Sequence, residues 1–316
     1  MAKERSLIAD YAVYLVVRLL VCFIQTLSWR LAERFAGLLA WLAYRVDHRH
    51  RLVALENLRH AFPGRYSEAE LDALVRATYR HFARLLVEII LTPRKLHVRN
   101  WKQHVEIVDD QRIVDRLLSG RPLLIVTGHF GNWEIAGYVL GLVGFTTYAI
   151  ARPLDNAFLD RFLRRFREYT GQKILAKHGD FEQMQDVLAK GGVLATLGDQ
   201  DAGQRGLFVS FFGRPASTHK AIALLALEYQ VPIAVSCTPR VGEPLRYHIV
   251  TEEVIFPEEY AGRPDAVKAI TQRFTDALER LIRRYPEQYF WLHNRWKHQP
   301  ARRARRAAAC QALPAA

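Results

Sequence analysis

The chain has 316 residues, enough for one large α/β domain or two smaller ones, and half of its residues are hydrophobic, which excludes a disordered chain. Its 45 Lys and Arg against 32 Asp and Glu give a net charge of +13, which favours an anionic partner: nucleic acid, an anionic membrane surface or a phosphorylated substrate. The cysteines Cys22, Cys237 and Cys310 are odd in number and far apart, which argues against a disulfide framework or a thiolate zinc site and favours a reducing cytoplasmic environment.

The N-terminal segment is the strongest membrane signal. Residues 11–27 are almost continuously apolar and are interrupted only by Arg18 and Gln25. The segment is just shorter than the roughly 20 residues of a clean span, and a central arginine costs about 2.5 to 3.5 kcal/mol on insertion scales. We therefore predict a short or interfacial anchor, with a full span and a buried helix as alternatives. A cleaved signal peptide fits poorly, because Glu4 and Asp10 weaken the positive region that should precede the apolar segment.

Two further helices are predicted before the middle of the chain. Apolar residues spaced for one helical face predict an amphipathic helix over Leu31–Val46. The basic residues of 45–51 follow it, and cations beside apolar segments suit an anionic membrane leaflet, with a solvated helix end as the alternative. A longer helix is predicted over Ser67–Leu91, because Ser67 as N-cap and Glu70 three residues on form a capping box.

From about residue 121 short apolar runs alternate with helical periods. The predicted strands are Leu123–Thr127, Thr146–Ile150, Lys173–Ala176, Val193–Leu197, Ile233–Thr238 and Arg246–Thr251. The predicted helices are Asn132–Leu142, Asn156–Tyr169, Phe181–Ala189, Ser217–Tyr229 and Pro264–Arg284. The alternation predicts an α/β fold with a largely parallel central sheet flanked by helices, preceded by an N-terminal helical, membrane-associated region.

These patterns divide the chain into four parts. Residues 1–46 are predicted to be membrane-anchoring helices, 47–120 a helical region and 121–298 the α/β core. Residues 299–316, rich in Ala and Arg, are predicted to be a basic, disordered tail.

The candidate catalytic residues lie in the segment GHFGNWE, residues 128–134, between the strand Leu123–Thr127 and the next helix. An imidazole takes a proton from a hydroxyl at neutral pH only in the correct tautomer, which a carboxylate fixes by accepting from the other nitrogen. His129 can close the strand while Glu134 lies in the first turn of the helix, so we expect the two side chains to face each other. A solvated or capping pair is the alternative.

Other mechanisms lack their motifs. The sequence has no G-x-S-x-G elbow, no G-x-x-x-x-G-K-[ST] loop and no G-x-G-x-x-G fingerprint, which argues against serine hydrolases, P-loop enzymes and dinucleotide binding. A metal site through His129 is poorly supported, because no second histidine follows at helical spacing. We therefore predict acid–base chemistry without a metal or cofactor.

Polar residues also follow two later strands. Arg152 ends the strand after the helix, at the carboxyl edge where open α/β sheets bind ligands, and its planar fork suits a phosphate. Asp199, Gln200 and Asp201 follow the strand Val193–Leu197 at the same edge and suit sugar hydroxyls or the orientation of the arginine. A surface arginine is the alternative for Arg152, and two aspartates alone are weak support for Ca²⁺ or Mg²⁺.

Taken together, these segments resemble the lipid A biosynthesis acyltransferases, the late lauroyl and myristoyl transferases within the glycerolipid acyltransferase superfamily. Their order and spacing agree over nearly the whole chain, and the N-terminal apolar segment stands where the family has its anchor. The matching motifs are H-x4-D/E as His129 to Glu134, RP-x-x-N as Arg152 to Asn156, DQD as Asp199 to Asp201, FFG-x-PA-[ST] as Phe211 to Ser217, and the segment Pro286 to Trp296.

The resemblance implies transfer of a fatty acyl group from acyl carrier protein to a hydroxyl of a phosphorylated lipid A precursor, at the cytoplasmic face of the bacterial inner membrane. It implies His129 as general base and Glu134 as the carboxylate that orients it, without a covalent intermediate. The substrate-binding residues that we predict on this basis are Arg152, Asn132, Asn156, Asp199, Gln200 and Asp201.

Three alternatives remain open from the sequence. Related enzymes acylate other glycolipids or phospholipids, with acyl carrier protein or acyl-CoA as donor. A basic, membrane-associated nucleic-acid-binding protein would explain the charge of +13, but the sequence has no recognised binding motif and no basic–aromatic platform, so we expect no nucleic-acid partner. A non-catalytic membrane scaffold would explain the N-terminus and leave the His–Glu pair without a role.

Overall fold

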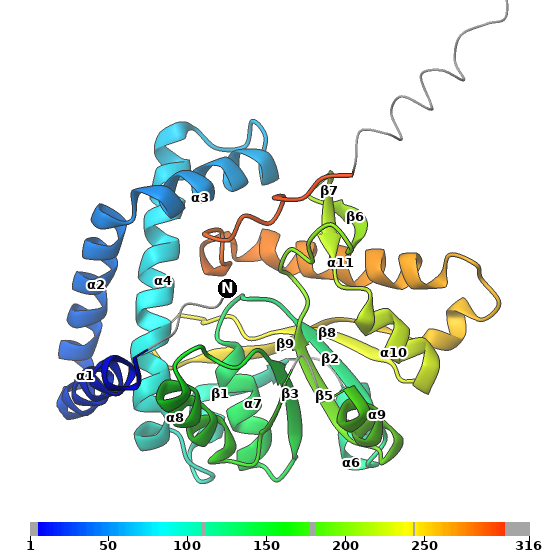
Figure 1. The fold of residues 1–316 in the computed structure, drawn as a ribbon, viewed down its shortest axis with the longest axis horizontal. Coiled ribbons are helices and arrows are strands. Elements are labelled where there is room, and N and C mark those ends of the chain that lie inside the picture. Colours follow the sequence, from blue (N-terminus) through cyan, green and yellow to red (C-terminus); the bar gives the residue numbers. More distant parts are fainter. Residues whose placement is uncertain (1–5, 109–110, 177–180, 243, 301–316) are drawn as a thin grey trace, which may run out of the picture.

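Seven strands pair in one sheet at the centre of the protein. The computed structural model describes residues 6–108, 111–176, 181–242 and 244–300 (Figure 1). The strand order is β1-β9-β8-β2-β5-β3-β4, and neighbours are parallel except β8 and β9. The strands are β1 Val105–Val108, β2 Leu123–Thr127, β3 Thr147–Ala151, β4 Lys173–Ala176, β5 Val193–Leu197, β8 Ile233–Cys237 and β9 Tyr247–Ile255. The predicted α/β fold with a largely parallel sheet is confirmed.

Helices connect the strands and cover the sheet (Figure 1). They are α6 Gln111–Leu118, α7 Trp133–Leu142, α8 Ala157–Glu168, α9 Phe181–Ala189, α10 Ala221–Tyr229 and α11 Ala266–Arg284, with the short α5 Trp101–His104 before β1 and the 3₁₀ turns η1 Pro257–Tyr260 and η2 Pro286–Gln288. All predicted helices of this region are present, and their ends differ by a few residues. One predicted helix, Ser217–Tyr229, differs in more than its ends, because its first residues form a strand.

Ser217 and Thr218 belong to a strand, which corrects that prediction. β6 Leu207–Phe211 and β7 Arg214–Thr218 form an antiparallel hairpin. Its two turn residues, Phe212 and Gly213, both have positive φ, 50° and 73°, which matches the right-handed twist of the paired strands. Pairing with β6 therefore keeps Ser217 and Thr218 extended, and α10 begins only at Ala221.

Four longer helices precede the short α5 and the sheet: α1 Leu7–Thr26, α2 Trp29–Val46, α3 His48–Ala61 and α4 Glu68–Lys95. Ser67 and Glu70 form the predicted capping box, and α4 continues past Leu91 to 28 residues. α3, which the sequence did not predict, takes up most of the basic residues of 45–51. Figure 1 shows α2 running along α4 beside the sheet.

α1 is long and apolar enough to cross a membrane, and in the described part of the chain it is the one helix that meets this criterion. Only Ile24 of its residues is buried, so the alternative of a buried N-terminal helix is wrong. The short or interfacial anchor stays a prediction, and so does its alternative, a full span.

The main hydrophobic core joins the helical region to the sheet. Leu58 of α3 and Val75 of α4 belong to the same buried cluster as Leu124 and Val126 of β2. β1, at the sheet edge, also comes from the segment 47–120. The fourfold division of the chain stays a prediction, and residues 301–316 of the tail lie outside the described residues.

Candidate active site

The segment between β2 and α7 is held in place by main-chain hydrogen bonds from two other parts of the chain. β2 lies inside the sheet between β5 and β8, so this turn starts from a well-supported strand. The His129 carbonyl accepts from Phe290 N–H at 3.0 Å, Gly131 N–H donates to Gln288 O at 3.1 Å, and Asn132 N–H donates to Thr238 O at 2.7 Å.

Gly131 is required at this turn for two reasons. Its φ is +61°, a conformation that other L residues adopt only at a cost. A Cβ at this position would also lie 2.2 Å from Thr238 O, inside van der Waals contact with main chain that cannot move freely. The glycine therefore allows the turn to press against the loop after β8.

His129 pairs with Asp199. Its Nδ1 lies 2.9 Å from Asp199 Oδ1, and its main-chain N–H donates to Asp199 Oδ2 at 2.8 Å. β2 and β5 are parallel and in register, with Thr127 opposite Leu197. Two residues beyond each strand, His129 and Asp199 are therefore neighbours at the carboxyl edge of the sheet.

This geometry corrects the expected contact between His129 and Glu134. The Glu134 carboxylate accepts from Arg167, with 3.0 Å between Nε and Oε2, and from Trp133 Nε1 at 3.1 Å. α7 starts only after a turn, so its first residues face α8, which carries Arg167, while the neighbouring strand end reaches the imidazole. Glu134 acts on His129 through its charge, without a hydrogen bond between them in the described contacts.

The imidazole is set up to accept a proton at Nε2. Burial lowers the pKa of His129, but the charge of Asp199, its hydrogen bond and the charge of Glu134 outweigh burial, so this pKa lies above the ordinary value. Burial likewise raises the pKa of Asp199, yet the charge and hydrogen bonds of His129 and the charge of Arg295 hold it below its usual range. An ionised Asp199 accepts from Nδ1–H, which leaves the lone pair on Nε2.

A cavity of about 640 Å³ opens in front of His129. Arg152 and Gln200 line it together with His129, and Gln200 Nε2 lies 3.4 Å from His129 Nε2. The Arg152 side chain is 77% exposed and pairs with Asp155, whose side chain is 67% exposed. The structure thus brings together His129, Arg152 and Gln200, with Asp199 directly behind the imidazole.

Three of the predicted substrate-binding residues have structural roles instead. Asn132 is fully buried; its Oδ1 caps α7 at Ile135 N–H and its Nδ2 donates to the Tyr247 hydroxyl. Asn156 is buried, caps α8 and donates from Nδ2 to Asp10 O. Their amide groups have these protein partners, so the prediction that they contact substrate is corrected.

Asp201 does not line the cavity either. Its Oδ2 lies 2.6 Å from His298 Nδ1 and accepts from Gly203 N–H, and its own N–H donates to His293 Nε2 at 3.0 Å. The carboxylate thus ties the loop after β5 to the C-terminal segment. No group of three His, Cys, Asp or Glu placed to hold a metal ion occurs among the residues that the structure describes.

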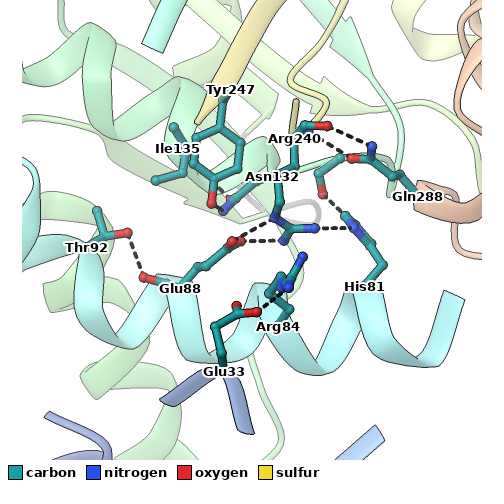
Figure 2. A network of polar contacts seen from close by, with 11 residues as sticks. Glu33, His81, Arg84, Glu88, Thr92, Asn132, Ile135, Arg240, Tyr247 and Gln288 are labelled. Carbon is teal, nitrogen blue, oxygen red and sulfur yellow. Dashed lines mark hydrogen bonds and ion pairs between the residues drawn. The ribbon is translucent and has the colours of Figure 1, made fainter. Parts of the chain in front are cut away.

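A buried polar network behind the turn was missed by the sequence analysis (Figure 2). Arg240 donates from Nε to Glu88 Oε1 at 2.7 Å and from Nη2 to Oε2 at 2.5 Å, and Glu88 is fully buried. Arg240 Nη1 also lies 3.0 Å from His81 Nδ1, and His81 Nε2 lies 3.2 Å from Gly131 O. The network therefore runs from α4 to the main chain of the turn.

The protonation state of His81 follows from its surroundings. Burial, and then the charge of Arg240, lower the pKa of His81 to about 3, so its ring is neutral at physiological pH. Nδ1 accepts from Arg240 and Nε2–H donates to the carbonyl of Gly131. The sequence held one signal for this contact: His81 and Glu88 are seven residues apart, which places both on one face of a helix, beside Leu85 and Leu91.

With this geometry in place, comparison with known proteins identifies the chain as an acyltransferase. Residues 1–298 match the family model of bacterial lipid A biosynthesis acyltransferases, and the chain belongs to that family. It is 26% identical over 258 residues to the lipid A biosynthesis palmitoleoyltransferase of Escherichia coli K12, covering 80% of each chain. The resemblance inferred from the motifs is confirmed.

Two further relatives span the range of printed functions. The lipid A biosynthesis lauroyltransferase of Escherichia coli K12 is 26% identical over 266 residues, which cover 82% of this chain and 83% of that protein. A phosphatidylinositol mannoside acyltransferase of Mycolicibacterium smegmatis is 28% identical over 233 residues, which cover 71% and 73%. Relatives of similar identity thus carry different lipid acceptors in their names.

We expect Gly131→Ala to destabilise the protein by at least about 3 kcal/mol, because left-handed strain and a clash with main chain add together. Gly64→Ala is the matched control: Gly64 has φ +69° but open space around its missing Cβ. Gly64→Ala should cost only the strain of a left-handed alanine, about 1 to 2 kcal/mol of stability. Chemical unfolding in detergent measures both, and equal losses would show that the clash with Thr238 does not matter.

We expect Glu88→Met alone to cost about 3 to 5 kcal/mol, because it leaves the buried guanidinium of Arg240 without its carboxylate. Adding Arg240→Met should recover much of that loss, since the unpaired charge is then gone. Asp186→Met breaks the exposed pair with Lys190 and should change stability little. The test is thermal unfolding of the wild type, Glu88→Met, Arg240→Met, the double variant and the Asp186→Met control. Additive losses for Glu88 and Arg240 would argue against a coupled pair.

Proposed function

We propose that the protein transfers a fatty acyl group from the thioester of acyl carrier protein to a hydroxyl of a phosphorylated lipid A precursor, with His129 as general base. The observation that carries this proposal is the His129–Asp199 pair, which presents Nε2 to a cavity that Arg152 also lines. The family membership supports acyl transfer to a lipid A-like glycolipid.

The proposed reaction needs one base and no covalent intermediate. Nε2 of His129 takes the proton of the acceptor hydroxyl while its oxygen attacks the thioester carbonyl, forming the C–O bond. The tetrahedral oxyanion collapses, the C–S bond breaks, and the leaving thiolate takes the proton from the imidazolium. Asp199 holds the tautomer throughout, and the charge of Glu134 adds to the stabilisation of the imidazolium.

Arg152 is the candidate phosphate ligand. Its pair with Asp155 is solvent-exposed and therefore weak, so an anionic substrate group can replace the carboxylate at little cost. Arg164 and Arg167 line the same cavity but are held by Asp160 and Glu134. Gln200 completes the polar lining, beside Nε2 of His129.

Membrane attachment through α1 is part of the proposal. Its exposed apolar residues include Leu7, Ile8, Val16 and Leu19, each more than half exposed. With free cysteines in the described part of the chain and a net charge of +13, they support a site at the cytoplasmic face of the bacterial inner membrane. Carrier protein and phosphorylated lipid are both acidic, so the basic charge suits either partner.

The second candidate acceptor is a phosphatidylinositol mannoside, favoured by the relative named for that activity. Detergent-solubilised protein incubated with acyl carrier proteins of several chain lengths, acyl-CoA, a lipid A precursor and a phosphatidylinositol mannoside distinguishes the two by product mass. We expect acylated lipid A precursor from acyl carrier protein. Acylation of the mannoside alone, or from acyl-CoA alone, would contradict the proposed acceptor or donor.

We expect His129→Ala to lower kcat/KM about 10² to 10⁴-fold, the usual contribution of a general base. His97→Ala, at an exposed position outside the cavity, is the matched control and should keep the wild-type rate. Wild-type turnover of folded His129→Ala would rule out the base.

The pH profile tests Asp199. A base works when unprotonated, so kcat/KM should rise with pH to a plateau, with a midpoint above 6.5 because the pKa of His129 is raised. Asp199→Asn removes the negative charge that favours the imidazolium, so the midpoint should move to lower pH while the plateau also falls. An unchanged midpoint would show that Asp199 does not act on His129.

A further inference from the structure

An apolar groove of about 850 Å³ lies between α1, α4 and α8. Val17 and Val21 of α1 form one side, Phe158 and Phe162 of α8 face them, and Ile90 of α4 adds to the lining. Figure 1 shows α1 beside α8, and the two helices are in contact. The volume falls in the range of pockets that hold a whole ligand.

Both ends of α1 are fixed against the rest of the protein, so the groove is a built feature. Near the start of the helix, the ring centroids of Tyr11 and Phe158 lie 5.2 Å apart, and Asn156 Nδ2 donates to Asp10 O. Near its end, Gln25 Nε2 donates to Ile90 O of α4, and Ile24 is fully buried. The apolar space between these contacts remains open.

The groove adjoins the cavity of His129. Leu154 and Leu163 line both. Leu154 follows Arg152 in the loop after β3, and Leu163 is half-buried on α8. A lipid whose chain lies in the groove is therefore next to the cavity that contains His129 and Arg152.

Three arginines add charge to this apolar lining. Arg18 lies on α1, with its guanidinium 5.0 Å from the ring centroid of Phe162 and donating to the Tyr14 hydroxyl. Arg161 and Arg165 are exposed on α8. Within the described ranges no carboxylate forms an ion pair with any of the three. An anionic head group would supply the missing charge.

We propose that this groove binds an acyl chain of an anionic, phosphate-bearing membrane lipid, the acceptor of the proposed reaction, on which this inference rests. One side of the groove is α1, whose outer face is apolar and exposed. A chain of a bilayer lipid can pass this helix without entering water, whereas the acyl chain on a carrier protein arrives from the aqueous side. The arginines then hold the head group beside the cavity.

The test is photolabelling of the full-length protein in phosphatidylcholine vesicles that contain a low fraction of phosphatidic acid with a diazirine in one acyl chain. Adducts are counted on α8 peptides, because α1 meets bilayer lipid in any case. Val17→Trp fills the groove, and Val16→Trp places the same side chain at the neighbouring, lipid-facing position. We expect about tenfold fewer α8 adducts for Val17→Trp and wild-type labelling for Val16→Trp. The factor of about ten corresponds to a lipid chain that loses the burial of two methylenes.

Further variants make each result decisive. Leu159→Trp fills the groove from α8 and should act like Val17→Trp, even if the α1 variant docks poorly. Arg161→Gln with Arg165→Gln should lower labelling by the phosphatidic acid probe several-fold and leave a matched phosphatidylcholine probe unchanged. Equal α8 labelling in the two valine variants would overturn the groove, and equal responses of the two probes would overturn the preference for an anionic lipid.

The outcome is separable from that of the proposed reaction. His129→Ala should label as the wild type does, since labelling needs no turnover. If no donor and acceptor pair reacts while α8 labelling behaves as expected, the proposed function fails and the groove stands. In a competition experiment, acyl carrier protein carrying a fatty acid could suppress α8 labelling while unlabelled phosphatidic acid does not. That result would assign the groove to the donor and overturn the inference.

Discussion

The contact between His129 and Asp199 is the constraint on which the candidate active site depends. It exists because β2 and β5 are parallel neighbours in register, so the residues just beyond both strands meet at one edge of the sheet. The buried carboxylate is stabilised there because it accepts from both the ring and the main chain of His129 and lies near the charge of Arg295. The same contact raises the pKa of the imidazole and directs its free nitrogen into the cavity.

The turn that carries His129 is itself held from behind. Burying the Glu88–Arg240 pair costs desolvation, which good geometry and further hydrogen bonds must offset. Arg240 meets this condition through Glu88 and His81, and His81 in turn donates a hydrogen bond to Gly131 O. α4, which carries Glu88 and His81, also packs against α1 and α2. One helix therefore supports both the turn and the apolar N-terminal helices.

Much of the fold could be predicted because its signals are local. The capping box of Ser67 and Glu70 marks the start of α4, and short apolar runs mark the parallel strands. The β6–β7 hairpin was missed because Ser217 and Thr218 also suit the start of a helix. Only their pairing with β6 across the turn at Phe212 makes them a strand. α3 was missed because its many basic residues conceal a buried face that includes Leu58.

The sequence by itself determined the class of fold, the family, and the presence of His129, Arg152 and Asp199 at strand ends. The tertiary structure decided which carboxylate meets the imidazole, and assigned Asn132 and Asn156 to helix caps. The physical reason is distance along the chain. Spacing reports contacts within one helix or turn, whereas a partner 70 residues away is chosen by strand order and register.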